Sequence, residues 1–247
     1  MHPLAGLRIV VTRAAAQGGE LAQALREAGA DVILLPMIEI APPSDPEPLR
    51  QAASKANQYD WIIFTSANAV QSFAAELPKE TRISNPQIAT VGAATRHAAE
   101  QQGFAVSLTP AEYVAEALIE SFRDHDLQGS RILIPSSAIA RDTVATQLRA
   151  RGALVDLVEA YRNILPPEAA KRAREIFQEP YPEWVIFASS SAVRNLAVLA
   201  GPAALRKVKI ASIGPVTSET VRDYGLEVAA EASSQTMRGI VEAICRT

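Results

Sequence analysis

The sequence predicts an α/β protein with two similar lobes, each a doubly wound parallel sheet flanked by helices, joined by two extended linker segments. Three observations predict this class: short continuous apolar runs, helical apolar spacing after each run, and the return of the whole pattern at one offset. Short continuous apolar runs are typical of strands buried on both faces, as in a parallel sheet. Strands that alternate with helices indicate a doubly wound arrangement.

The repeat is visible as blocks that match in register along the two halves of the chain. The first two blocks return at an offset of 131 − 8 = 123 and 184 − 61 = 123, and the third returns at 210 − 88 = 122. Repetition at a nearly constant spacing indicates a duplicated structural unit. We therefore interpret the chain as an internal duplication. The matched segments are 8–11 with 131–134, 61–66 with 184–189, and 88–92 with 210–214.

Each apolar run is predicted to be a strand that leads into a helix. After the run at 61–65, for example, apolar residues stand at positions 70, 73, 74 and 77, which is the spacing of one helix face. Glycines stand just past the predicted helix ends, where a left-handed cap favours glycine. These glycines are Gly29, Gly103, Gly152 and Gly225. The expected strands are 9–12, 61–65, 88–91, 132–134, 185–188 and 210–213.

Prolines mark the expected boundaries between the lobes. The proline-rich stretch 42–48 and the pair Pro166-Pro167 are predicted to be neither helix nor central strand. The offset of 123 carries Pro43 onto Pro166, so both breaks fall at the same point of the repeat. The alternative of two tandem halves that meet near residue 125 stays open. We expect one lobe of residues 1–36 plus 167–247, a second lobe of residues 42–159, and interlobe linkers at 37–41 and 160–166.

Composition excludes several classes of function. The net charge is −3 with mixed signs, whereas a nucleic-acid partner requires a basic stripe. Cys245 is the single cysteine, which argues against disulfides, and three scattered histidines argue against a metal site. No Gly-rich dinucleotide loop, phosphate loop or serine nucleophile elbow is found. We therefore expect no metal and no cofactor. No signal core or membrane-length apolar run is present, so we expect a cytoplasmic protein without a membrane partner.

Hydroxyl-bearing and small residues follow five of the predicted strands. Ligands of open α/β sheets bind beyond the carboxyl ends of the strands, where helix N-termini present N–H groups to anions. Each loop taken alone has an ordinary explanation as a helix N-cap. Five such loops on the same sheet edges indicate a cleft of neutral donors suited to a ligand with several carboxylates. The candidate binding residues are Thr65, Ser66, Asn68, Gly92, Thr95, Ser136, Ser137, Ser189, Ser190, Gly214 and Thr217.

A few side chains outside these loops are further candidates. Thr12 and Arg13 end the first strand, and Arg13 is either a solvated surface charge or an anion ligand. Arg96 and Arg141 stand at helix starts and are weaker candidates. Tyr161 lies in the second crossing segment, where its phenol either packs with a wet tip or faces the ligand. No pair of carboxylates is found at these loops, so no acid–base dyad is predicted.

The ordered set of these segments resembles the uroporphyrinogen-III synthase family. The similarity runs the whole length of the chain and comprises 10–13, 63–70, 91–95, 158–162 and 213–217. The resemblance implies a cofactor-free, usually monomeric carbon–oxygen lyase of tetrapyrrole (haem and porphyrin) biosynthesis. Its substrate would be hydroxymethylbilane, a linear tetrapyrrole with eight carboxylates. Members of the family have two lobes linked by a two-stranded ladder.

The resemblance also implies a reaction course. The hydroxyl of ring A leaves as water and gives an azafulvene, ring D is attacked at its substituted carbon to give a spiro intermediate, and reclosure inverts ring D to yield uroporphyrinogen III. Unassisted closure would give the symmetric isomer, so the enzyme mainly positions a flexible chain. Tyr161 is implied to assist hydroxyl departure, and Ser66 and Thr217 match positions that face the cleft. Val216 departs from the family pattern, which often has a hydroxyl residue there.

Two other functions are compatible with the residues alone. A two-lobed binding or sensor protein for a small polyanionic metabolite would use the same donor loops without chemistry. A nucleotide-dependent transferase of similar fold would need a phosphate loop, which the sequence lacks.

Overall fold

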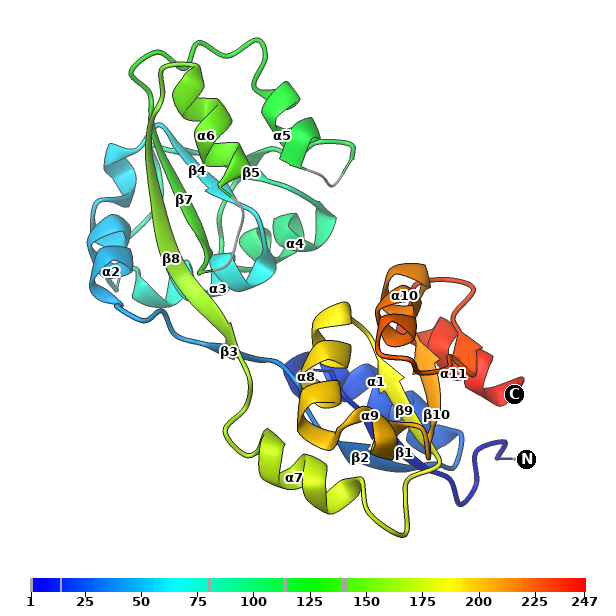
Figure 1. Cartoon of the computed structure of the whole chain (residues 1–247). Helices are drawn as coiled ribbons and strands as arrows, with labels where there is room; N and C mark the ends of the chain where they lie inside the picture. The colour runs from blue at the N-terminus through cyan, green and yellow to red at the C-terminus, as the bar shows by residue number, and fades with distance from the viewer. Residues whose placement is uncertain (1, 14, 80, 113–114, 139–141) are drawn as a thin grey trace. The chain divides into compact units, whose positions relative to one another are not determined.

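The chain forms two compact units, each with its own sheet and core (Figure 1). The structure is a computed structural model that describes residues 2–13, 15–79, 81–112, 115–138 and 142–247. Unit 1 comprises Met1–Glu39 and Ile164–Thr247, and unit 2 comprises Ile40–Asn163. A tandem division near residue 125 would fall inside unit 2, between α5 (Ala115–Ser121) and β7 (Arg131–Ser137).

Unit 1 is a parallel sheet covered by helices on both faces. Its strand order is β11-β10-β9-β1-β2, so the N-terminal β1 (blue in Figure 1) lies beside β9 (yellow). The strands are β1 (Arg8–Val11), β2 (Asp31–Leu34), β9 (Trp184–Phe187), β10 (Lys209–Ser212) and β11 (Ala230–Glu231). One face packs against α1 (Ala15–Glu27) and α11 (Met237–Cys245). The other packs against α7 (Ala169–Ile176), α8 (Ser190–Ala200), α9 (Pro202–Leu205) and α10 (Pro215–Asp223).

Unit 2 has the same layered construction. Its strand order is β3-β8-β7-β4-β5-β6, and the strands from β4 to β8 are parallel. The strands are β3 (Glu39–Ala41), β4 (Trp61–Phe64), β5 (Gln87–Thr90), β6 (Val106–Leu108), β7 and β8 (Leu154–Ile164). One face packs against α2 (Glu47–Ser54), α3 (Ala67–Glu76) and α4 (Ala93–Gln101), and a 3-10 turn η1 (Ala56–Gln58) precedes β4. The other face packs against α5 and α6 (Thr143–Ala150).

The predicted α/β class with parallel, helix-flanked sheets is confirmed. All six predicted strands are present, within one to three residues of the expected bounds. The predicted left-handed glycines are also confirmed, for example at Gly29, with φ of 96°, and at Gly152, with φ of 88°. The strands that no apolar run predicted, such as β2, β6 and β11, lie at sheet edges. Edge strands are partly exposed, so they need no continuous apolar run.

Three local expectations differ from the structure. Ser136 and Ser137 were expected at a helix start, but they belong to β7, and α6 begins only at Thr143. Of residues 160–166, expected as linker, residues 160–164 belong to β8, and Ala160 and Tyr161 pack in the core of unit 2. Pro48 lies in the first turn of α2. Proline is tolerated there because the first N–H groups of a helix have no intrahelical partner.

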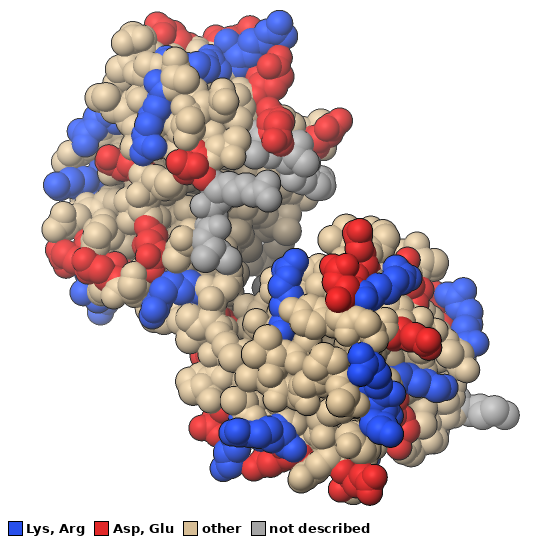
Figure 2. Space-filling model, viewed as in Figure 1, with Lys and Arg blue, Asp and Glu red and all other residues tan. Residues whose placement is uncertain are grey.

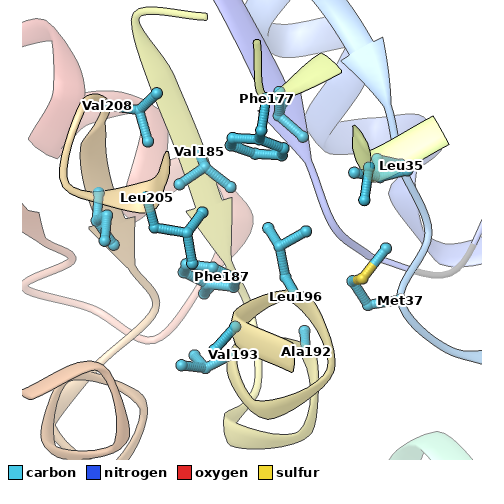
Figure 3. Packing of buried hydrophobic residues seen from close by; sticks show 14 of the residues in the cluster. Leu35, Met37, Phe177, Val185, Phe187, Ala192, Val193, Leu196, Leu205 and Val208 are labelled. Carbon is cyan, nitrogen blue, oxygen red and sulfur yellow. The ribbon is translucent and has the colours of Figure 1, made fainter. Parts of the chain in front are cut away.

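The core of unit 1 shows why the repeated apolar runs form these strands. Figure 3 shows Val185 and Phe187 of β9 among Val193 and Leu196 of α8 and Leu205 of α9. The four residues of β9 are all buried, as are the four residues of β4 in unit 2. Burial on both faces explains the continuous apolar runs. It also leaves the carboxyl ends of the strands as the natural place for polar side chains.

Candidate functional site

The structure places the predicted site residues at the carboxyl edges of the two sheets. It divides them into two groups, one in each unit, at the ends of neighbouring strands. The group in unit 2 comprises Thr65, Ser66, Asn68, Gly92, Thr95, Ser136, Ser137 and Tyr161. The group in unit 1 comprises Thr12, Arg13, Ser189, Ser190, Gly214 and Thr217.

Each sheet has a point at which its strand order reverses. In unit 1 the chain runs from β1 to β2 on one side and from β9 to β11 on the other, so β1 and β9 flank this point. In unit 2 the corresponding neighbours are β7 and β4. Ligands of open α/β sheets bind in the crevice beyond the strand ends at such a point. Ser66 follows β4 and Ser189 follows β9, so both lie where the fold favours ligand binding.

The most specific arrangement in unit 2 joins Ser66 and Tyr161. The Ser66 Oγ atom lies 3.1 Å from the Tyr161 hydroxyl, and it also accepts a hydrogen bond from the Ala69 N–H at 3.1 Å. Ser66 is thus the N-cap of α3, as its ordinary interpretation predicted. Tyr161 is 8% exposed, and its ring packs in the core of unit 2. A packed ring therefore holds a polar hydroxyl at the start of a helix.

Two serines of β7 lie beside this hydroxyl pair along the sheet. Ser137 is the register partner of Tyr161 on β8, and Ser136 pairs with Glu159. Ser136 is 5% exposed, whereas Ser137 is partly exposed. Because they lie in a strand, these serines do not cap a helix. They add hydroxyl groups to the edge where Tyr161 lies.

Helices α4 and α10 begin in the same way in the two units. Gly92 and Gly214 are their N-caps and offer no side chain to accept from the first N–H groups, which have no intrahelical partner in any helix. The first position of α10 is Pro215, which has no N–H, so α10 offers one donor fewer than α4. Thr95 and Thr217 stand three residues later and are 7% and 5% exposed. The offset of 122 relates both pairs, since 92 + 122 = 214 and 95 + 122 = 217. Such helix starts are suited to binding carboxylates.

The hydroxyls of unit 1 are more fully engaged within the protein. Ser189 caps α8 by accepting from the Ala192 N–H at 3.3 Å. The Ser190 hydroxyl donates to the Val216 carbonyl at 3.3 Å and accepts from Thr220 at 2.7 Å, which links the starts of α8 and α10. Val216 itself, where the family pattern often has a hydroxyl, is 71% exposed. Ser190 therefore holds two loops together.

Thr12 and Arg13 also make internal contacts. Thr12 is 1% exposed and donates from Oγ1 to the Ile186 carbonyl at 2.7 Å, so its hydroxyl hydrogen is used within the sheet. Arg13 is partly exposed, and its Nη1 atom lies 3.0 Å from the Met237 sulfur. Of the weaker candidates, Arg96 pairs with Glu100 at 2.8 Å, and Arg141 lies outside the described residues.

Several polar residues at the same sheet edges were missed by sequence reasoning. Thr90 at the end of β5 bonds Thr109 at 2.8 Å. Ser212 at the end of β10 bonds Ser218, which in turn bonds Glu231. The internal repeat could have pointed to these residues, because it relates Thr90 to Ser212 (90 + 122 = 212) and Thr109 to Glu231 (109 + 122 = 231).

The visible surface of the protein carries charges of both signs (Figure 2). Figure 2 shows Lys and Arg interspersed with Asp and Glu on the visible face of both units. Within the described ranges, no cluster of three or more His, Cys, Asp or Glu side chains is suited to a metal ion. Across the same ranges, no helix is both long and apolar enough to span a membrane.

Comparisons with known proteins give one consistent result. A family model for uroporphyrinogen-III synthase HemD matches residues 19–242. A uroporphyrinogen-III synthase of Synechococcus elongatus is 35% identical, over 98% of this chain and 96% of its own length. A putative uroporphyrinogen-III synthase of Methanothermobacter thermautotrophicus is 29% identical, over 88% of this chain and 90% of its own length.

Solved structures agree in fold. A mutant uroporphyrinogen III synthase from Thermus thermophilus superimposes with a TM-score of 0.65 at 16% identity, covering 98% of both chains. Uroporphyrinogen-III synthetase from Helicobacter pylori gives a TM-score of 0.64 at 17% identity, covering 97% of this chain and 99% of its own. At such low identity these likenesses show the fold alone, whereas the family model and the sequence relatives show the family. The chain belongs to the uroporphyrinogen-III synthase family.

Proposed function

We propose that this chain cyclises hydroxymethylbilane to uroporphyrinogen III with loss of water and inversion of ring D. The observation that carries the proposal is the hydroxyl pair of Ser66 and Tyr161 at the carboxyl edge of unit 2, 3.1 Å apart. Family membership indicates which reaction is catalysed, and in this pair the packed ring of Tyr161 holds its hydroxyl in a fixed place. The reaction balances with water as the only other product: the ring A carbon–oxygen bond breaks, and the final ring closure returns a proton.

The hydrogen bonds around Ser66 suggest how Tyr161 would act. The Ser66 Oγ atom accepts from the Ala69 N–H, so its own hydrogen is free to point at the Tyr161 oxygen. The phenol hydrogen is then free for a substrate atom. A hydrogen bond to the departing hydroxyl would assist cleavage of the carbon–oxygen bond. We assign Tyr161 this role.

The helix starts and hydroxyls would hold the carboxylates of the substrate. N-capping glycines leave the first N–H groups of α4 open to an anion, and those of Val216 and Thr217 in α10, where Pro215 has no N–H. The helix dipole favours negative charge at both places. Thr65, Asn68, Ser136 and Ser137 would add donors in unit 2, and Arg13 would add a cation in unit 1. Holding a flexible tetrapyrrole in the less favoured geometry is catalysis by positioning.

We further propose that the two units arose by duplication of one half-chain and act as two lobes of one monomeric enzyme. Replacing each strand by its partner at the offset of 122 to 124 turns the order β11-β10-β9-β1-β2 into β6-β5-β4-β7-β8. Those strands have that same order in unit 2. The lobe bounds would be 1–36 plus 167–247 and 42–159, with β8 continuing from the second lobe through residues 160–164 of the linker. Sedimentation at several protein concentrations tests the monomer.

A binding or sensor protein for a small polyanionic metabolite is the competing function. It would use the same helix starts, but it has no use for a phenol held against Ser66. A sensor would bind hydroxymethylbilane saturably and leave its spontaneous closure to the symmetric isomer unchanged.

One assay separates the two functions. Freshly made hydroxymethylbilane is incubated with the protein, the products are oxidised to uroporphyrins, and isomers I and III are separated chromatographically. We expect isomer III to predominate with the native protein and isomer I with heat-denatured protein. Isomer I alone in both samples would contradict the proposed function.

A further inference from the structure

The segment after β11 supports the loops of unit 1 that carry the proposed anion sites. We call residues 231–237 the support segment. The Glu231 carboxylate accepts a hydrogen bond from Ser218 in the first turns of α10. The Gln235 side chain lies so close to Gly214 that a Cβ added there would stand 3.0 Å from its Cγ. Met237 lies 3.0 Å from Arg13. The support segment therefore contacts both the loop after β1, which contains Arg13, and the start of α10 after β10, which contains Gly214.

The hydrogen-bond directions at Glu231 follow from the chemistry of the groups. Ser212 and Ser218 are both 0% exposed, and their Oγ atoms lie 2.5 Å apart. The single hydroxyl hydrogen of Ser218 goes to the Glu231 carboxylate, so Ser212 must donate to Ser218. The hydroxyls of Ser212 and Ser218 thus form a chain of hydrogen bonds that ends at the Glu231 carboxylate. Removing that acceptor leaves a buried donor without a partner, which favours a different conformation of the loop.

In unit 2 the ends of the corresponding strands are joined without a charged residue. At the corresponding positions Thr90 bonds Thr109 at 2.8 Å. A neutral pair therefore suffices to tie these strand ends together. A carboxylate at the edge that would bind a polycarboxylate costs electrostatic repulsion. Its presence in unit 1 indicates that Glu231 has a task beyond linking two strands.

We propose that Glu231 is a positioning residue for ring closure. Through Ser218 it holds the first turns of α10, so that the N–H groups of Val216 and Thr217 stay directed at one substrate carboxylate. This inference rests on the proposed function. Glu231 itself touches no substrate atom in this proposal.

The test uses three full-length variants and the isomer assay. Glu231→Ala removes the acceptor, and we expect KM to rise and kcat/KM to fall about tenfold, because a small misplacement of a binding group is costly. KM does not depend on how much of the protein is folded, so its rise separates a positioning role from a loss of stability. The share of isomer I should also rise when samples are matched in folded protein by circular dichroism. Glu231→Gln keeps an acceptor oxygen and should therefore show nearly native KM, kcat/KM and isomer share. Glu242→Gln removes an exposed carboxylate of α11 in the same unit and should change neither.

A fourth variant tests whether Glu231 acts through Ser218. Ser218→Ala removes the linking hydroxyl, and the double variant with Glu231→Ala should be no worse than either single variant. Native KM and isomer ratio in Glu231→Ala, or equal impairment of the Ala and Gln variants, would overturn the inference alone. Native protein that yields only isomer I would overturn the proposed function and the inference with it.

Discussion

The two units use the same order of parallel strands but carry different polar side chains. Ser66 and Ser189 correspond at the offset of 123, and each caps the helix that follows its strand. Only Ser66 meets a tyrosine, because the residue that corresponds to Tyr161 is Ile38, at 161 − 123 = 38. Unit 1 instead carries the carboxylate of Glu231. The shared caps therefore belong to the fold, and the residues that differ are the better candidates for function.

The cores differ as well, and this difference gives the largest expected effect. Phe64 and Phe187 correspond at the offset of 123, and both are 0% exposed. Phe64 lies 5.6 Å from Phe73 and 5.9 Å from Phe104, ring centre to ring centre, whereas Phe187 packs among aliphatic side chains (Figure 3). Phe→Ala in a core costs about 3–5 kcal/mol. We expect Phe64→Ala to cost about 1 kcal/mol more than Phe187→Ala, since it also loses aromatic pairs.

Urea unfolding of both variants measures this difference. The transition of each variant should be compared with that of the native chain by circular dichroism and by tryptophan fluorescence, since Trp61 and Trp184 stand in corresponding strands. A larger loss of free energy of unfolding in Phe187→Ala would show that aromatic pairing does not distinguish the two cores.

The tyrosine in unit 2 gives the next effect, on turnover. Tyr161→Phe keeps the packed ring and removes the hydroxyl beside Ser66. We expect kcat to fall roughly tenfold, less than the typical effect of losing a full general acid, because this phenol donates a hydrogen bond without transferring its proton. Tyr59→Phe is the matched control, because Tyr59 is also a buried, hydrogen-bonded tyrosine of unit 2, outside the site. Unchanged kcat in Tyr161→Phe would remove this residue from the mechanism.

Sequence reasoning predicted the strands well because burial on both faces leaves a continuous apolar run. It missed the extent of β7, because the apolar run ends at Ile134 while the strand continues to Ser137. Pairing of β7 with β4 ends at Leu133, so Pro135 needs no N–H for that ladder and the strand continues along β8. The site was harder to predict. Ser66 and Tyr161 are 95 residues apart, and only the folded sheet brings them together.

Comparing the two serine caps tests whether they are equivalent in stability and different in function. Ser66→Ala and Ser189→Ala each remove one cap, and we expect each to cost about 1 kcal/mol of unfolding free energy. Ser66→Ala also leaves Tyr161 without its partner, so its kcat should fall several-fold more than that of Ser189→Ala. Thermal melts and steady-state assays of both variants measure the two effects. An equal loss of kcat would mean that the tyrosine contact does not set the caps apart.

Tyr59 gives the smallest effect, and one that depends on pH. Its hydroxyl donates to Asp156 at 2.8 Å, and burial, followed by that hydrogen bond, raises the pKa of Tyr59 well above its ordinary value of 10.0. Below pH 10 the phenol is neutral in both states, so Tyr59→Phe should cost about 1 kcal/mol or less through the lost hydrogen bond to an exposed carboxylate. Above pH 10 the unfolded phenol ionises while the folded one keeps its proton, so the native chain loses stability that the variant keeps. Urea titrations between pH 8 and pH 11 should therefore show the gap between the two proteins closing. A gap that stays constant would mean that the folded and unfolded phenols ionise alike.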